Sequence, residues 1–446
     1  MKRVLPVLAA SLLLLTSAPA AFAAAGLSSV QSDEIQMSYD LLTSEFYKRV
    51  DPQVPLDGAR REMIAYLHHR GIAEPAVPDL RAGSDTTADA RALEDAVATV
   101  AKKYGDKVSS RDLTYSAISG VLDSVHDKYT VFLDPKEYAQ LNEGLDGGNF
   151  SGVGLVIQVD DKTKLLEVAE VIAGGPADRA GVQAGDAITA VDGVSTKGLT
   201  SDTDAKMLRG PQNSHVTLAI ERNGVAIAPI VITREVIHAP SVFSKMLDGN
   251  IGYARLSVFG LDTGSELSKA LHDLDGQGAK AIILDLRDNG GGYLNTAVDV
   301  SSEFIPSGPI VSVESRGGND TEYDAENVAI PPKPLAVLVN GYTASASEIT
   351  SGALQDDGVG KLIGTKTYGK GVVQTIHQLP DGSAVKITTA RYLTPRGRDI
   401  NLIGIEPDIV TSEPKTARLG DPGDDPQLQA AITYLQGKLA EANASS

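Results

Sequence analysis

Ser345 and Lys370 are a candidate nucleophile and a candidate general base. Ser345 lies between an apolar stretch at 335–340, which predicts a buried strand, and a helical pattern at 348–356. This places Ser345 at or near a helix N-terminus, where unpaired N–H groups favour an anion such as the oxyanion of an acyl transfer. Lys370 stands between two glycines without acidic neighbours. A lysine removed from water loses its proton more easily and can act as a base. Taken singly, Ser345 also fits a helix cap and Lys370 a solvated lysine at a strand end.

The motifs around this pair resemble the signature of the carboxyl-terminal processing (tail-specific) proteases. They are Asn-x-x-Thr-Ala-Ser-Ala-Ser-Glu-Ile at 340–349, Gly-Lys-Gly at 369–371, and Gln374. The resemblance implies a Ser345/Lys370 dyad in which Gln374 orients the lysine amine. It also implies a scaffold around the dyad, formed by Glu348, Asp356 and Thr367.

A glycine-rich turn, Asp288-Asn-Gly-Gly-Gly292, follows an apolar strand at 279–287 and precedes a predicted helix. Glycines at such a turn let the backbone approach a ligand closely. The resemblance implies that this turn supplies one N–H of an oxyanion hole, from either Gly291 or Gly292, and that Ala346 supplies the other.

From about residue 149 the pattern changes to short strands separated by glycines. The segments at 151–157, 175–186 and 188–193 resemble a PDZ domain that extends to Glu235. In this interpretation, backbone N–H groups receive the terminal carboxylate of a peptide, which adds as a strand to the sheet edge. The alternative is that the glycines only make a tight turn. The expected peptide-binding residues are Gly152, Val153, Gly154, Leu155 and Ile157.

Arg209, in Leu-Arg-Gly-Pro at 208–211, has two interpretations. The resemblance implies a link between the PDZ domain and the catalytic core. An ordinary solvated arginine fits the sequence equally well.

The chain of 446 residues is too long for a single core and predicts several domains. We expect a signal peptide at 1–23, a helical region at 24–135, a PDZ domain at 140–235, a catalytic core at 236–415 and a helical tail at 416–446. In the first region, helices are expected at 32–47, 88–103 and 114–125. The core alternates strands and helices, and the resemblance implies a crotonase-like α/β fold. The overall prediction is a multidomain α/β protein.

The N-terminus has the charged, apolar and small-residue regions of a signal peptide, with cleavage expected after Ala23. An uncleaved anchor is the alternative. The protein is therefore expected to be exported, to a periplasmic or other extracytoplasmic location, with envelope association left open.

The chain has no cysteine, which excludes disulfides and thiolate zinc sites. A net charge of −18 argues against nucleic acid and anionic membrane as partners.

Three other functions fit parts of the sequence. Residues 364–370 nearly match a phosphate-binding loop, but Gly371 stands where a Ser or Thr should hold magnesium. A Ser/His/Asp hydrolase would need a histidine base, and the candidates are His238, His272 and His377. The third is a PDZ adaptor without catalysis.

The favoured function is an ATP-independent serine endopeptidase that cleaves unfolded or tail-bearing protein substrates selected by the PDZ domain. No metal or other cofactor is expected, since His126 and the pair His68 and His69 lack ligand spacing. Family members often assemble through terminal helices, so a homo-oligomer is an expected partner.

Overall fold

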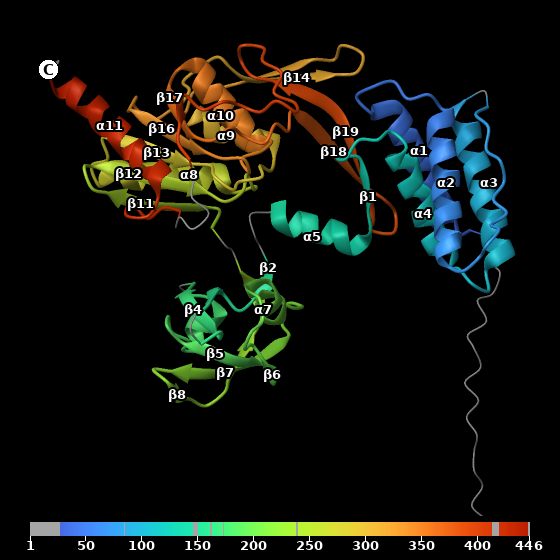
Figure 1. Ribbon diagram of the computed structural model, residues 1–446, viewed down its shortest axis with the longest axis horizontal. Helices are drawn as coiled ribbons and strands as arrows, with labels where there is room; N and C mark the ends of the chain where they lie inside the picture. The colour runs from blue at the N-terminus through green and yellow to red at the C-terminus, as the bar shows by residue number, and fades with distance from the viewer. Residues whose placement is uncertain are drawn as a thin grey trace, which may run out of the picture. The chain divides into compact units, whose positions relative to one another are not determined.

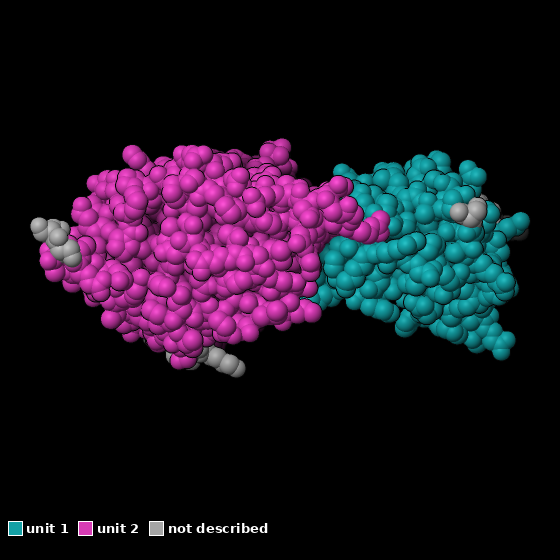
Figure 2. Space-filling model, turned by 90° about the horizontal axis from the view of Figure 1, so that it is seen from above, with its two compact units in different colours: residues 1–135, 374–388 teal, residues 136–373, 389–446 magenta. Residues whose placement is uncertain are grey.

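The computed structural model describes residues 27–83, 85–145, 150–160, 163–172, 174–237, 240–412 and 419–444. The chain divides into two compact units (Figure 2), residues 1–135 with 374–388 and residues 136–373 with 389–446. The predicted signal peptide lies outside the described residues. Within the described residues, no helix is long and apolar enough to cross a membrane.

The first unit is built on four helices, α1 (Ser29–Glu45), α2 (Gln53–His69), α3 (Thr86–Tyr104) and α4 (Ser110–Asp123). The side chains of Ser28, Asp85 and Ser109 accept backbone N–H groups at the starts of α1, α3 and α4. Such caps satisfy donors that have no partner inside the helix. The three helices expected in this region are present with shifted ends, whereas α2 was not predicted from the sequence.

Residues 374–388 also belong to the first unit, although they follow Lys370 in the sequence. They come from a hairpin of β18 (Val372–Gln378) and β19 (Ala384–Leu393). Strand β1 (Val131–Leu133) pairs antiparallel with β19. The buried side chains of Leu379, Val385 and Ile387 pack in the apolar core of the helices. This hairpin therefore completes the core of the helical unit.

In the second unit, helix α5 (Pro135–Leu145) precedes a small β-rich domain (Figure 1). The two ends of this domain lie side by side, because β2 (Phe150–Gly152) pairs with β10 (Glu235–Ile237). The sheet between them runs in the order β3-β4-β5-β7-β8, with β6 paired to β5 and β9 to β7. Its strands are β3 (Leu155–Val159), β4 (Leu166–Val171), β5 (Ala187–Val191), β6 (Val194–Ser195), β7 (His215–Arg222), β8 (Val225–Ala226) and β9 (Ile230–Thr233). Two helices accompany it, α6 (Pro176–Arg179) and α7 (Ser201–Leu208), and α7 lies against the edge strand β3.

The rest of the second unit is a six-stranded sheet between helices (Figure 1). The strand order is β11 (Val242–Leu247), β12 (Ile251–Leu256), β13 (Ala281–Asp285), β16 (Leu335–Val339), β17 (Gly360–Gly364) and β20 (Ile409–Val410). All neighbours except β11 and β12 pair in parallel. Every residue of β13 and β16 is buried, as expected for parallel strands covered on both faces.

Helices cover both faces of this sheet. One face packs against α8 (Thr263–Gly276), α9 (Leu294–Ser302) and α10 (Ala346–Asp357), and the other packs against α11 (Pro426–Ala444). Two further strands, β14 (Pro309–Ser315) and β15 (Thr321–Asp324), continue the sheet of β19. The predicted α/β core and its closing helix are therefore confirmed.

The parallel strands bring three segments to one edge of the sheet, because their carboxyl ends point the same way. The segments are the glycine-rich turn at 288–292 after β13, the turn at 340–345 after β16, and residues 365–370 after β17. Open α/β sheets bind their ligands at this edge.

Arg287 forms a buried ionic cluster directly before the glycine-rich turn. Its guanidinium contacts Asp285 at 2.6 Å and Asp425 at 2.7 Å, and all three side chains are inaccessible to water. Asp425 also accepts the N–H of Leu428 in the first turn of α11 and the N–H of Gly420. Burial by itself would raise the pKa of Asp425, but the Arg287 hydrogen bonds and charge, together with the Leu428 and Gly420 N–H groups, outweigh it and hold that pKa below its usual range.

We predict that Asp425→Ala lowers the free energy of unfolding of the second unit by about 3–5 kcal/mol, because Arg287 would be left buried with one partner missing. The depressed pKa also sets a pH dependence. The contribution of Asp425 is complete above the ordinary Asp pKa of about 3.9 and is lost as the pH falls through the lower native value. Urea unfolding followed by circular dichroism, at neutral and acidic pH, measures both effects. The exposed neighbour Asp424 supplies the control, and equal stability of Asp425→Ala and Asp424→Ala would contradict the prediction.

Candidate active site

Ser345 occupies a strained turn between strand β16 and helix α10. Its backbone has φ 59° and ψ −120°, a region that residues other than glycine rarely adopt. Thr343 fixes the turn, because its hydroxyl donates to the Leu286 carbonyl at 2.9 Å and accepts the Asn340 N–H at 2.9 Å. Strain held by the surrounding structure is typical of functional sites, and a strand–turn–helix is a known way to present a nucleophile.

The carboxylate of Glu348 holds the backbones of both candidate dyad residues. One oxygen accepts the N–H of Ser345 at 3.0 Å and the N–H of Lys370 at 2.8 Å. The other accepts the Gly369 N–H at 2.7 Å and the Thr367 hydroxyl at 2.5 Å. The Glu348 side chain is fully buried. A single carboxylate therefore fixes the spacing between the two segments.

Tyr392, on strand β19, makes a second connection between the same two residues. Its hydroxyl lies 2.5 Å from the Lys370 carbonyl oxygen and 3.1 Å from the Ser345 carbonyl oxygen, so its single proton is shared between these two acceptors. Tyr392 is 1% exposed. Ser345 and Lys370 themselves are half-buried. The backbones of Ser345 and Lys370 therefore share two partners: Glu348 binds their N–H groups, and Tyr392 binds their carbonyl groups.

The N–H groups near Ser345 distinguish between the two candidate glycines. The Gly291 N–H donates to the Asn289 side-chain oxygen at 2.9 Å, so it is already used. Among the residues that the structure describes, neither the Gly292 N–H nor the Ala346 N–H donates a hydrogen bond. Gly292 and Ala346 are therefore the better candidates for an oxyanion hole.

Gly291 is nevertheless required for close approach of the glycine-rich turn to Ser345, the candidate nucleophile. A Cβ at this position would lie 2.8 Å from the Ser345 Cβ, 2.8 Å from the Ala346 nitrogen and 2.7 Å from the Ala344 carbonyl oxygen. Its φ of 98° also disfavours any side chain. The backbone contacts cannot yield as a flexible side chain would.

We predict that Gly291→Ala lowers kcat for peptide hydrolysis by about 10- to 100-fold, because the turn must move by tenths of an ångström relative to Ser345. The matched control is Gly290→Ala, since an added Cβ at Gly290 meets no atom within 4 Å. Steady-state kinetics of both variants on one peptide measure the difference. Similar activity of the two variants would contradict this role of Gly291.

The other residues predicted around Ser345 and Lys370, and the three candidate histidines, lie on several different elements. Gln374 is half-buried in β18. Asp356 is nearly buried and forms an ion pair with Arg398 at 2.5 Å. Of the candidate histidines, His377 contacts Glu45 of the helical unit at 2.7 Å and His272 is exposed on α8. His238 lies outside the described residues. These positions give no support to a Ser/His/Asp triad.

The predicted peptide-binding residues lie at the start of the β-rich domain. Gly152 ends β2 and Leu155 begins β3, so the loop between them contains only Val153 and Gly154. The Val153 side chain is 2% exposed in the domain core, whereas Leu155 and Ile157 are half-buried. Val153 therefore contributes backbone rather than a pocket wall.

Arg209 ends helix α7 and forms an exposed ion pair with Glu143 of α5 at 3.1 Å. Exposed pairs of this kind contribute little to stability. The Arg209 ion pair thus reaches the helix that precedes the β-rich domain, and the link to the catalytic core stays a prediction.

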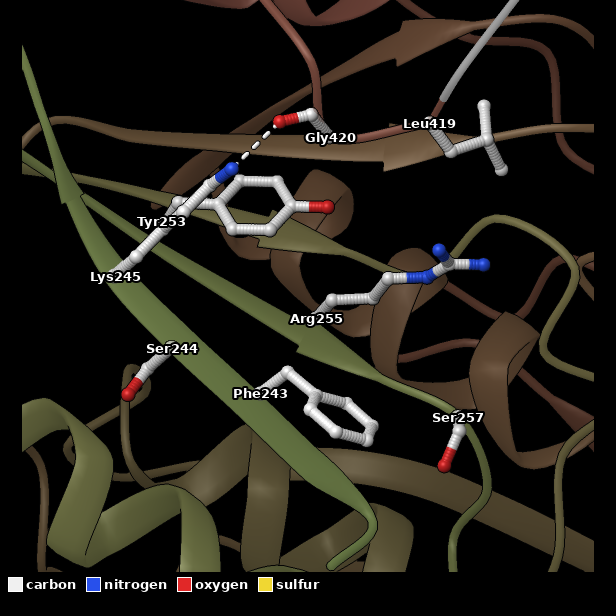
Figure 3. A pocket seen from close by; sticks show the side chains of 8 residues that line it. All are labelled: Phe243, Ser244, Lys245, Tyr253, Arg255, Ser257, Leu419 and Gly420. Atoms are coloured by element: carbon white, nitrogen blue, oxygen red, sulfur yellow. Dashed lines mark hydrogen bonds between the residues drawn. The ribbon is translucent and has the colours of Figure 1, made fainter. Parts of the chain in front are cut away.

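A cavity of about 500 Å³ lies over the β11–β12 part of the sheet (Figure 3). Phe243 is opposite Arg255 and Lys245 is opposite Tyr253 in the strand pair. The Lys245 ammonium donates to the Gly420 carbonyl at 2.7 Å. The Arg255 guanidinium lies 3.8 Å from Asp288, the first residue of the glycine-rich turn. The cavity therefore borders that turn, but Ser345 and Lys370 are not among its lining residues.

Two residues that organise the site were not predicted from the sequence. Asn289 donates to the Leu256 carbonyl, and its own carbonyl accepts the Ala344 N–H and the Ser347 hydroxyl. Tyr392 is the other. The Asp-Asn-Gly-Gly-Gly motif did offer a signal for Asn289, because a buried Asn in a turn commonly bonds the nearby backbone. No motif or spacing in the sequence around Tyr392 indicates its role at the site.

Comparisons with known proteins agree with this arrangement. Residues 250–411 match the model of peptidase family S41, and residues 167–222 match a PDZ domain. A carboxyl-terminal-processing protease of Synechocystis is 40% identical over 344 residues, covering 76% of this chain and 80% of that protein. The carboxy-terminal processing protease CtpA of Bacillus subtilis is 36% identical, covering 77% and 72%.

Among solved structures, the photosystem II D1 C-terminal processing protease aligns with a TM-score of 0.50 and 29% identity, covering 92% of this chain and 98% of that one. These matches confirm the family resemblance, the fold class and the enzyme class that the sequence predicted. The chain therefore belongs to the carboxyl-terminal processing proteases of peptidase family S41, serine proteases that here carry a PDZ domain.

Proposed function

We propose that the protein is an exported, ATP-independent endopeptidase that uses a Ser345/Lys370 dyad and selects its substrates by their C-terminal tails. The observation that carries the dyad is the shared anchoring of Ser345 and Lys370 by the Glu348 carboxylate and the Tyr392 hydroxyl. Catalytic groups need such fixed spacing, because misplacement by about 1 Å can cost a hundredfold in rate.

In the proposed reaction, the neutral Lys370 amine takes the proton of the Ser345 hydroxyl while the serine oxygen attacks the peptide carbonyl carbon. The Gly292 and Ala346 N–H groups donate to the oxyanion. The Lys370 ammonium then returns a proton to the leaving amine as the C–N bond breaks. Water, deprotonated by Lys370, hydrolyses the ester to release the acyl product and restore Ser345. Gln374 is proposed to orient the lysine amine.

Export is supported by the signal-peptide pattern at 1–23, and it would place the enzyme outside the cytoplasm, where ATP is scarce. The proposed substrates are unfolded or tail-bearing proteins. Assembly into a homo-oligomer is part of the same proposal, with α11 as the terminal helix that could take part.

Tail selection is supported by the geometry of the PDZ domain. Strand β3 is an edge strand and α7 lies against it, which leaves a strand edge to which an extended peptide can add. Gly154 has a φ of 78°, so the loop before β3 turns in a way that suits a nest of N–H groups for a terminal carboxylate. Leu155 and Ile157, on one side of β3, could receive an apolar final residue.

We predict that amidation of the substrate C-terminus, or replacement of an apolar final residue by Asp, weakens recognition by about 1–3 kcal/mol. Amidation removes the charge that the N–H groups satisfy, and Asp would place a charge in an apolar pocket. Initial cleavage rates of one unfolded substrate with free, amidated or Asp-ended tails measure the effect.

The control is a variant without the PDZ sheet. Because Gly152 and Glu235 are opposite each other in the β2–β10 pair, residues 153–234 can be replaced by a two-residue Asn-Gly turn. This variant should cleave all three substrates at similar rates. If the intact enzyme also failed to discriminate among the tails, the tail-specific part of the proposal would fall while the dyad chemistry would stand.

A further inference from the structure

We propose that an exposed apolar patch beside the dyad binds an apolar side chain of the substrate within two residues of the cleaved bond. The patch, here called the dyad-flanking patch, consists of Tyr342, Tyr368, Leu402 and Ile403. This inference rests on the proposed dyad and adds a second selection step, which is separate from recognition of the C-terminus by the PDZ domain.

The four side chains of the dyad-flanking patch are unusually accessible for large apolar and aromatic residues. Their exposed fractions are 73% for Tyr342, 49% for Tyr368, 79% for Leu402 and 59% for Ile403. Scattered apolar residues on a surface need no explanation, but a group of them beside a site indicates a binding surface.

Backbone hydrogen bonds connect the two tyrosines to the nucleophile turn. Tyr342 lies three residues before Ser345 in the same turn. Its N–H donates to the Asn340 side-chain oxygen at 3.0 Å. The Tyr368 N–H donates to the Thr343 carbonyl at 3.0 Å. Tyr342 and Tyr368 therefore belong to the two segments that carry Ser345 and Lys370.

The loop at 400–405 is fixed against the Gly-Lys-Gly segment. The Leu402 N–H donates to the Gly369 carbonyl at 2.8 Å, and the Gly371 N–H donates to the Asn401 side-chain oxygen at 3.3 Å. The approach is so close that a Cβ at Gly369 would lie 2.8 Å from the Gly404 nitrogen. Leu402 and Ile403 are thus held next to Lys370 by the backbone.

Leu402 has a conformation and an exposure that do not serve folding. Its φ is 61°, in the left-handed region that favours glycine and asparagine, and most of its side chain contacts water. Folding would be better served by Gly or Asn at this position. A bulky apolar side chain held there at a cost in strain points to a ligand.

The substrate is a better occupant of the dyad-flanking patch than a second copy of this chain. The patch is continuous with the segments of Ser345 and Lys370, so a protein surface bound to it permanently would obstruct access to the dyad. An unfolded substrate, by contrast, can place an apolar side chain on the patch while the neighbouring peptide bond reaches Ser345.

The test compares two peptides that share one C-terminal tail and differ only in having Leu or Ser beside the cleaved bond. The intact mature chain should prefer the Leu peptide in kcat/KM, since an apolar pocket discriminates by about 10- to 200-fold. Leu402→Asn keeps a residue that tolerates the left-handed conformation but removes the apolar side chain. It should lose at least about tenfold of this preference, through slower cleavage of the Leu peptide.

Three variants complete the design. Leu402→Met should keep the preference, and Ile403→Ser should reduce it in the same direction as Leu402→Asn. Val328→Asn changes an equally exposed apolar residue, 53% accessible, in the loop before β16, and should have no effect. Thermal unfolding of each variant shows whether the fold is retained.

The inference is overturned if the wild type cleaves both peptides equally, if Leu402→Asn keeps the full preference, or if it slows both peptides alike. A change of oligomeric state in Leu402→Asn, measured by sedimentation, would overturn it in favour of contact between copies. Absence of any Ser345-dependent cleavage is a different result, because it would remove the proposed dyad itself.

Discussion

Ser345→Ala and Lys370→Arg should each reduce peptide hydrolysis by at least about 10⁴-fold while the protein remains folded. Members of a nucleophile–base unit act together, so the loss of either removes most of the catalysis. Alanine has no oxygen to attack the carbonyl. Arginine keeps its proton at any accessible pH and cannot act as a base. Initial rates on an unfolded substrate, together with thermal unfolding of each variant, measure the effect.

Neighbouring residues provide matched controls. Ser351 is a buried serine on the same helix, with its hydroxyl bonded to the Ser347 carbonyl, and Lys366 is a half-exposed lysine just before Lys370. Ser351→Ala and Lys366→Arg should keep the activity within a few-fold. Substantial turnover by Lys370→Arg would refute the lysine as base, and turnover by Ser345→Ala would refute the serine as nucleophile.

Glu348→Gln should lower kcat by about 100- to 1000-fold, although Glu348 is not proposed to touch the substrate. Its two oxygens accept four hydrogen bonds, from Ser345, Lys370, Gly369 and Thr367. A glutamine replaces one oxygen by an NH₂ group, which cannot accept a hydrogen bond. Two donors would therefore lose their acceptor, and the segments of the dyad would move apart.

A purely structural effect can be separated from this positioning role. Glu266 has a comparable arrangement in the same unit, since one carboxylate oxygen accepts the N–H groups of Ser241 and Val242 and the Ser241 hydroxyl. Glu266→Gln keeps an oxygen that can accept all three of these hydrogen bonds, so it should change neither kcat nor stability strongly, whereas Glu266→Ala should lose stability without a comparable loss of kcat. If Glu348→Gln changed only stability, or only KM, the shared carboxylate would not be setting the geometry of the dyad.

The sequence alone determined the local structure around the site. The apolar run at 335–340 specified a buried strand, the following pattern specified helix α10, and Ser345 was placed correctly at the helix N-terminus. The same reasoning located the glycine-rich turn between β13 and α9. These features depend on hydrophobic period and on capping, which act over a few residues and can therefore be read directly from the chain.

Tertiary structure alone decided which groups surround Ser345 and Lys370. Tyr392 reaches the Ser345 carbonyl from 47 positions away, and Asn289 meets Ser347 across 58 positions. The preference for Gly292 over Gly291 as an oxyanion-hole candidate rests on the side-chain orientation of Asn289, which no periodicity encodes. The sequence also did not predict that residues 374–388 pack with the helices, because apolar side chains in a hairpin can pack against any complementary core. Hydrogen bonds and packing between distant segments are fixed only when the whole chain closes around them, whereas strand and helix preferences are already present in each short stretch.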